Sequence, residues 1–276
     1  MPEVGETVRV RALGHIAAGA LRASGGRVAP LPAFPAAPYG LAAGEIVWVG
    51  QSGPMHPRAV FVTLPCSLED EFVPETRAWR PLPANRCNTP GPRLRAALSG
   101  LAGGLLYGLP PRGYAPLIAA RPLEFLLQAR RSEALALARA ATSNDPSGFV
   151  AAATRLLGLG GGLTPSGDDF VGGALFALRL IHANDPGWLA AAATIRTLAP
   201  TRTHAISAAL LADLANGESF APLHQLLSAA MADAPPLVML THARAVTAIG
   251  HSSGWDMVAG IFAASAALPE STVSSI

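Results

Sequence analysis

The sequence predicts an α+β protein, in which a small N-terminal β domain, barrel- or sandwich-like, precedes a larger, mainly helical domain. Up to about residue 90 the chain consists of short β-branched and aromatic runs broken by Gly and Pro, which is typical of strands. Beyond that point apolar residues recur at helical spacing. The 276 residues are 50% hydrophobic and 14% charged, as expected of a globular chain with one or two domains. We expect the domains to be residues 1–88 and 89–276.

Three strands are predicted in the first part, at Thr7–Val10, Glu45–Val49 and Ala59–Leu64. The stretch Ala29–Pro38 holds four prolines, which exclude a central strand and predict an ordered loop or an edge crossing. The proline-rich segment Pro81–Pro92 is expected to link the two domains.

The second part is predicted to be a helical bundle. Helices are expected around 123–137 and at 145–157, 166–182, 186–198, 203–214, 221–231, 236–247 and 254–267. Several of these segments are apolar nearly all round, as in Phe170–Leu178, which places them inside the bundle. No repeat of 20 to 50 residues is visible, so a solenoid is not expected.

The basic residues exclude several classes of enzyme. All 20 positive charges are arginine, because the chain has no lysine. A P-loop, a pyridoxal phosphate enzyme and a protein kinase each need a lysine in their standard form. The arginines are scattered and the net charge is only +2, so no nucleic-acid partner is expected.

Cysteine usage and hydropathy point to a reduced compartment away from membranes. Cys66 and Cys87 have neither zinc-ligand spacing nor a disulfide framework, and we expect two buried free thiols. The segment Met1–Arg11 has no apolar run, so no signal peptide is expected. The longest candidate membrane stretch, Met257–Leu268, is too short to span a bilayer. We therefore expect a cytoplasmic protein without membrane contact.

The most informative segment is Gly-Leu-Gly-Gly-Gly-Leu-Thr-Pro-Ser-Gly-Asp-Asp-Phe at 158–170. Glycines let the backbone approach a ligand, and the helix that follows offers N–H groups and a positive dipole end, which suit a phosphate or carboxylate. Part of the pattern is explained by helix capping alone. Thr164 before Pro165 fits an N-cap, and Ser166 with Asp169 fits a capping box. The candidate ligand-binding residues here are Gly160, Gly161, Gly162, Thr164, Ser166, Gly167 and Asp169.

Asp168 is predicted to be catalytic. It extends a helix face that is apolar further along, at Val171 and Leu175, and a buried acid there needs a partner, a metal or a substrate. Asp168 and Asp169 would also suit Mg²⁺ beside a phosphate, but adjacent aspartates at a helix start are common without metal, so no metal and no cofactor are expected. No strand precedes the glycines, which excludes a Rossmann site.

Two further helix entries carry dense polar residues. Thr201, Arg202 and Thr203 lie in a segment expected to open a helix and clamp a small anion, although a plain threonine N-cap explains the pattern about as well.

The other entry, Gly-His-Ser-Ser-Gly-Trp-Asp at 250–256, offers His251 as a general acid or base. Ser252 and Ser253 are candidate ligand-binding residues, and Ser253 with Asp256 fits a capping box. A Ser-His-Asp triad is disfavoured because neighbours on one short loop rarely meet in triad geometry. The remaining histidines have no ligand-like spacing.

Together, the segments at 158–170, 203–207 and 250–256 resemble a bacterial family that includes the AllH subunit of oxamate carbamoyltransferase. The resemblance implies a subunit of an enzyme that interconverts oxalurate plus phosphate with oxamate plus carbamoyl phosphate, in anaerobic allantoin breakdown. It also implies partner subunits similar to FdrA and AllG.

Two other functions remain open at this point. A Mg²⁺-dependent phosphotransferase would place the glycine turn around a nucleotide phosphate, but the missing lysine weakens it. A non-catalytic scaffold that binds a small anion and holds partner subunits is the other alternative. We expect the three motifs to converge, because three Gly-rich helix entries in one domain exceed what packing requires.

Overall fold

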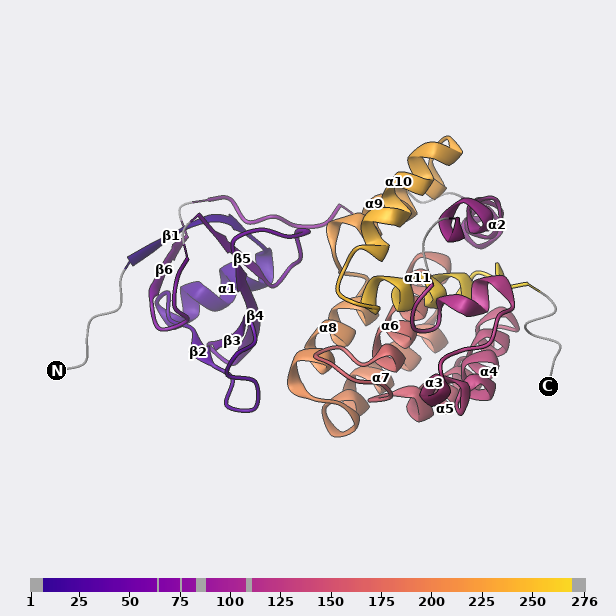
Figure 1. The fold of residues 1–276 in the computed structure, drawn as a ribbon, viewed down its shortest axis with the longest axis horizontal. Helices are drawn as coiled ribbons and strands as arrows, with labels where there is room; N and C mark the ends of the chain where they lie inside the picture. The colour runs from indigo at the N-terminus through magenta and orange to yellow at the C-terminus, as the bar shows by residue number, and fades with distance from the viewer. Residues whose placement is uncertain (1–6, 64, 75, 83–87, 108–110, 270–276) are drawn as a thin grey trace. The chain divides into compact units, whose positions relative to one another are not determined.

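The computed structural model describes residues 7–63, 65–74, 76–82, 88–107 and 111–269. A sheet-rich N-terminal part is followed by a mainly helical part, which confirms the predicted α+β class (Figure 1). The chain divides into two compact units, Met1–Leu82 with Ser219–Ala221, and Pro83–Glu218 with Pro222–Ile276. The limits predicted from the sequence, 1–88 and 89–276, stay predictions, and the sequence did not indicate that residues 219–221 join the first unit.

The first unit is a curled, six-stranded sheet in the order β2-β3-β4-β5-β1-β6. The strands are β1 (Thr7–Leu13), β2 (Ala29–Pro30), β3 (Tyr39–Ala42), β4 (Glu45–Gly50), β5 (Ala59–Val62) and β6 (Glu71–Pro74). The pairs β1·β6 and β4·β5 are parallel and the other pairs are antiparallel. The proline-rich stretch supplies only the short edge strand β2, as expected of residues that lack a backbone donor.

The sheet packs its inner face on one helix, α1 (His15–Ser24), which the sequence analysis did not predict. Ala17, Ala18 and Leu21 of α1 are buried against the sheet. Alanine is the best helix former, and its small side chain lets the helix lie close to the strands. Cys66 is a free thiol, but it is only half-buried and not buried as expected. Cys87 lies outside the described residues.

Residues 219–221 complete the first unit from far along the chain. The N–H of Ala221 donates to the carbonyl oxygen of Met55 at 2.7 Å. The Phe220 ring lies 4.5 Å from the His56 ring and 6.3 Å from the Trp48 ring. Residues 219–221 are therefore held in the first unit by aromatic contacts as well as by a backbone hydrogen bond.

In its described residues, the second unit consists of α-helices and one 3-10 turn. They are α2 (Pro90–Leu106), η1 (Ala115–Ala119), α3 (Phe125–Gln128), α4 (Arg131–Thr142), α5 (Pro146–Leu156), α6 (Ser166–Ile181), α7 (Pro186–Arg202), α8 (Ala205–Ala215), α9 (Ala221–Met231), α10 (Pro236–Thr247) and α11 (Ser253–Ala264).

Three details differ from the sequence analysis. The helix α2 was not predicted. The predicted linker Pro81–Pro92 ends inside α2, because proline fits the first turn of a helix, where no intrahelical donor is needed; residues 83–87 lie outside the described residues. The turn Pro200–Arg202 closes α7 and does not open the next helix, since the N–H of Thr203 still donates to the carbonyl of Ala199.

The core of this unit is the pair α6 and α11. Gly167–Leu178 of α6 and Gly254–Ala264 of α11 are buried throughout, which confirms that these helices lie inside the bundle. The helix α6 packs also on α5 and α8, and α11 packs on α4 and α10 (Figure 1).

Glycines bring the backbones of α6 and α11 into direct contact. A Cβ atom at Gly173 would lie 2.1 Å from the carbonyl oxygen of Met257, and one at Gly260 would lie 2.1 Å from the carbonyl oxygen of Phe170. No side chain fits at either position. The close approach therefore holds the starts of the two helices in a fixed relation.

We predict that Gly260→Ala destabilises the protein by on the order of 3 kcal/mol, because the new methyl group must push two backbones apart. The matched control is Gly100→Ala on α2, where a Cβ would meet nothing within 4 Å. That change should stabilise by up to about 1 kcal/mol through helix propensity. Urea unfolding of both variants measures the difference, and equal effects would contradict the close contact.

Candidate functional site

The three polar segments contact one another at the starts of α6 and α11. The Thr164 and Ser253 hydroxyls lie 2.7 Å apart, and the Ser166 and Ser252 hydroxyls lie 3.4 Å apart. The third segment is joined to the first by the Thr203 hydroxyl, which donates to Asp168 at 2.6 Å. The predicted motifs thus meet in one place.

The two helix entries are built in a similar way, although their left-handed glycines lie six and three residues before the first helical serine. A left-handed glycine, Gly160 in one and Gly250 in the other, packs on the first helical serine, with φ of 117° and 62°. Only glycine takes such angles without strain, and a side chain at Gly160 would also strike the N–H of Ser166.

The second residue of each helix is again a glycine in close contact. A Cβ at Gly167 would lie 1.9 Å from the carbonyl oxygen of Leu156, and one at Gly254 would lie 1.8 Å from that of Val246. The N–H groups of these two glycines donate to the carbonyls of Leu159 and Ile249. Each helix start is therefore locked onto the end of the helix before it.

This shared construction reflects an internal repeat in the sequence. Ser-Gly-Asp-Asp-Phe-Val-Gly-Gly at 166–173 corresponds to Ser-Gly-Trp-Asp-Met-Val-Ala-Gly at 253–260. Asp169 and Asp256 occupy the same position in the two copies. Asp168 corresponds to Trp255 and has no counterpart of its own kind.

Asp168 is buried and serves as the acceptor of three hydrogen bonds. Its Oδ1 atom accepts from the N–H of Gly158 at 2.7 Å, and its Oδ2 atom accepts from the hydroxyls of Thr203 and Ser207, each at 2.6 Å. Its side chain thereby ties the glycine turn to the junction of α7 and α8. These bonds account for its burial without a ligand.

Asp169 is buried beside the second helix start. Burial raises the pKa of its carboxyl well above the ordinary value, and the nearby Asp256 adds to the rise. The hydroxyls of Ser253 and Thr164 act in the opposite direction. Within the described part of the chain, its Oδ2 atom has no hydrogen-bond partner.

Asp256 is fully buried and mirrors Asp169. Burial raises the pKa of its carboxyl to about 7, although the hydroxyls of Ser166 and Ser252 act to lower it. Its Oδ1 atom accepts from the N–H of Tyr114 at 2.7 Å, while its Oδ2 atom has no partner among the described residues. The two carboxyls thus each contact the first serine of the opposite helix.

The loop before η1 is shaped around Asp256. Gly113 has a φ of 58°, and a Cβ there would overlap the Asp256 carboxyl. The Tyr114 ring lies 4.5 Å from the Phe170 ring, and burial, with the charge of Asp256, raises the pKa of the Tyr114 hydroxyl. The same loop carries Arg112 to the edge of the site.

Arg112 and His251 form a pair at the entrance to α11. The Nη1 atom of Arg112 lies 2.9 Å from Nδ1 of His251 and donates to the His251 carbonyl oxygen at 3.1 Å. The imidazole of His251 is exposed, so it is accessible to a ligand.

The other sequence-predicted residues lie around this centre. Gly161 and Gly162 are exposed, with nothing within 4 Å of a Cβ at either. The carbonyl oxygen of Gly162 lies 3.2 Å from His204 Nε2. Thr201 and Arg202 have exposed side chains in the last turn of α7, and the Thr201 hydroxyl donates to the Leu198 carbonyl.

Two predicted capping boxes do not form. Pro165 and Ser252 occupy the N-cap positions of α6 and α11, and neither makes a side-chain cap. Asp169 and Asp256 turn instead toward the opposite helix, because the close contact of the helices brings hydroxyls of that helix within reach.

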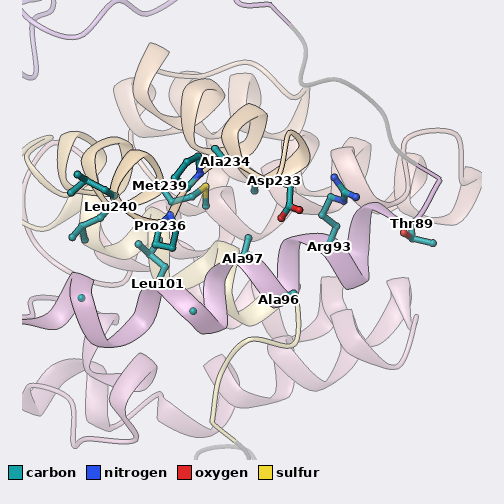
Figure 2. Close-up of a pocket in the computed structure, with 15 residues that line it drawn as sticks. Thr89, Arg93, Ala96, Ala97, Leu101, Asp233, Ala234, Pro236, Met239 and Leu240 are labelled. Atoms are coloured by element: carbon teal, nitrogen blue, oxygen red, sulfur yellow. The ribbon is translucent and has the colours of Figure 1, made fainter.

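The site is separate from a groove of about 780 Å³ between α2 and α10 (Figure 2). Ala96, Ala97, Leu101, Met239 and Leu240 give that groove a mainly apolar lining. Such a lining does not suit a small anion.

No group of three or more His, Cys, Asp or Glu side chains in the described parts of the chain is arranged to hold a metal ion. Among the described helices, none combines the length and the apolar character that crossing a membrane requires.

The structure is that of a two-unit α+β protein whose helical unit brings three Gly- and hydroxyl-rich segments together. Residues 156–265 match the family model described as oxamate carbamoyltransferase subunit AllH. This match confirms the resemblance seen in the three motifs, all of which lie inside the matched segment. The family name describes a subunit, and hence a component of a multi-subunit enzyme. No curated protein and no solved structure matches the chain.

The sequence analysis missed Arg112, Tyr114 and the pairing of Asp169 with Asp256. Arg112 lies far from the motifs in the sequence and carries no pattern of its own. The aspartate pair did have a signal, since aligning the two helix entries on Ser-Gly reveals the equivalence of Asp169 and Asp256.

We predict that Asp168→Asn lowers the free energy of unfolding by on the order of 2 kcal/mol, because one amide oxygen cannot replace a carboxylate that accepts three hydrogen bonds. Asp185→Asn is the control, since Asp185 caps α7 and asparagine caps equally well. Urea unfolding distinguishes the two variants. A stable Asp168→Asn protein that lost only its catalytic function would contradict the structural role and support the predicted catalytic one.

Proposed function

We propose that the chain is a subunit of a carbamoyltransferase that interconverts oxalurate plus phosphate with oxamate plus carbamoyl phosphate. In this proposal the anionic substrates bind over the adjoining starts of α6 and α11. The family name supports the enzyme, and the matched segment contains both helix starts.

The observation that carries the proposal is the meeting of two helix N-termini beneath a set of hydroxyls. Each N-terminus carries roughly half a positive charge, so two adjoining starts favour an anion more than one does. The glycine turn adds to this tendency. Gly160 and Gly162 have left-handed φ while Gly161 between them does not, and alternation of this kind turns successive N–H groups toward one side.

The chemistry requires an oxyanion to be stabilised and a proton to be moved. A phosphate oxygen attacks the carbamoyl carbon of oxalurate, the bond from that carbon to the oxamate nitrogen breaks, and the nitrogen takes up a proton. We assign oxyanion stabilisation to Arg112 with the backbone donors of the glycine turn. We assign the proton transfer to His251, whose exposed imidazole can reach a bound ligand.

Asp168 has a supporting part in this proposal. Its two oxygens already accept from Gly158, Thr203 and Ser207, so it positions the glycine turn. Thr203 supports the glycine turn indirectly, through its hydrogen bond to Asp168. Thr164, Ser166, Ser252 and Ser253 supply the hydroxyls that face the ligand.

The proposal places the chain in a cytoplasmic complex that breaks down allantoin. Its partner subunits would be similar to FdrA and AllG, and this subunit would bind the small anionic substrates. The proposal includes no redox cofactor, because transfer of a carbamoyl group between phosphate and an amide is redox-neutral.

We predict that carbamoyl phosphate or phosphate stabilises the purified chain without metal, by about 2.7 kcal/mol at 100 times the dissociation constant. Arg112→Ala should weaken this binding about tenfold or more, since it removes a charged donor. Arg202→Ala is the matched control and should change binding less than about threefold, because its side chain lies exposed at the end of α7. Thermal unfolding with each ligand measures both effects.

Other outcomes separate the alternatives. Stabilisation only by ATP with Mg²⁺ would favour the phosphotransferase. No stabilisation by any anion would favour a scaffold subunit. A complex containing this chain that forms no carbamoyl phosphate from oxalurate and phosphate would contradict the proposed reaction.

A further inference from the structure

Four hydroxyls form a layer between the solvent and two buried carboxyls. The layer consists of Thr164, Ser166, Ser252 and Ser253, all of them half-buried. Beneath it lie Asp169, which is 5% exposed, and Asp256, which is 0% exposed. A ligand at the helix starts therefore meets the hydroxyls first, and the hydroxyls meet the carboxyls.

Each carboxyl has an oxygen that nothing in the described parts of the chain satisfies. The Oδ2 atoms of Asp169 and Asp256 are buried and without a hydrogen-bond partner. An ionised oxygen in this position would carry a large desolvation cost. A protonated Oδ2 could instead donate to a neighbouring hydroxyl.

The protonation state of the carboxyls determines whether the hydroxyl protons of the layer point inward, toward the carboxyls, or outward, toward the ligand. An ionised carboxylate only accepts, so the hydroxyls point their protons inward and present lone pairs to the ligand. A protonated carboxyl can donate to a hydroxyl, which is then free to turn its own proton outward. Outward protons attract an oxyanion, and outward lone pairs repel it.

We infer that Asp169 and Asp256 act together as a proton-controlled switch beneath the hydroxyl layer, so that an oxyanion binds at the helix starts only while the pair holds protons. Neither residue needs to touch the ligand, and both are positioning residues. This inference rests on the proposed anion site and adds the property that regulates it.

The charges around the pair agree with this role. Asp256 and Asp168 act on Asp169, and Glu124 acts on Asp256, each raising the pKa of the carboxyl that it faces. The buried Tyr114 hydroxyl also faces Asp256. Arg112 and His251 are the basic groups at the rim.

The direction of the pH effect follows from these shifts. The pKa of Asp256 is raised to about 7, so this carboxyl is protonated below that pH and loses its proton above it. The pKa of Asp169 is also raised, by burial and by the charge of Asp256, so both carboxyls are shifted in the same direction. Binding of an oxyanion should therefore weaken as pH rises through about 7.

The test is sulfate binding to the full chain, measured by calorimetry from pH 6 to pH 8.5. Sulfate has the shape of phosphate but does not titrate in this range. We expect the affinity of the wild-type chain to fall as the pH rises, by at most about tenfold per pH unit for one linked proton. Repeating the titration in buffers of different ionisation enthalpy should show proton uptake on binding.

Asp256→Asn is the informative variant. Its amide oxygen can still accept from Tyr114, and its amide nitrogen can donate to the hydroxyls as a protonated carboxyl would. We expect it to bind sulfate at pH 8 as tightly as the wild type does at pH 6, without proton uptake. Asp169→Asn provides a second, independent variant of the same kind.

Two controls isolate the pair. Asp145→Asn changes an exposed helix cap and should keep the wild-type pH profile. His251→Gln should keep a slope near pH 7, because the slope belongs to the carboxyls and not to the imidazole. A flat profile in His251→Gln would assign the effect to histidine and overturn the inference.

The remaining outcomes separate this inference from the proposed function. Sulfate binding that does not change with pH would overturn the switch and leave the anion site intact. If the sulfate affinity of Asp256→Asn depended on pH as steeply as that of the wild type, the switch would likewise be overturned and the anion site would stand. A correctly folded wild-type chain that binds no sulfate at any pH would overturn both.

Discussion

The contact of α6 with α11 through their backbones is the constraint on which the rest of the structure depends. Gly173 and Gly260 allow the two helices to approach until carbonyl groups of one lie where side chains of the other would be. This approach aligns two helix starts, and it encloses Asp169 and Asp256 beside each other and beneath the hydroxyls of the opposite helix. The electrostatics of the site are thus a consequence of how closely the helices pack.

The internal repeat explains why such an arrangement is possible. Two copies of a helix entry with the same glycine contacts present the same face to each other, so each aspartate finds the serine of the opposite copy. The copies have also diverged. Asp168 ties the first entry to α8, whereas Trp255 fills the equivalent position in the second. One aspartate therefore supports the fold, while the pair carries the unusual protonation.

Much of this could be predicted from the sequence, and the rest depended on distant contacts. Apolar periodicity predicted most helices of the second unit, because burial on all sides leaves a strong signal in segments such as Phe170–Leu178. The helices α1 and α2 and the strands β3 and β6 were missed, since helices rich in alanine and glycine and four-residue strands carry little local signal. The aspartates were misread as helix caps, because capping is a local pattern and their true neighbours lie on another helix. Arg112 could not be found, since only the folded chain brings it to His251.

The central claim is that two buried carboxyls hold protons at the adjoining helix starts. Carbon-13 NMR of the aspartate carboxyls, with Asp169→Asn and Asp256→Asn to assign the signals, measures this directly. Our account predicts that both signals are those of protonated carboxyls at pH 6 and that at least one changes near pH 7. Two signals that titrate near the ordinary aspartate value of about 3.9 would contradict it.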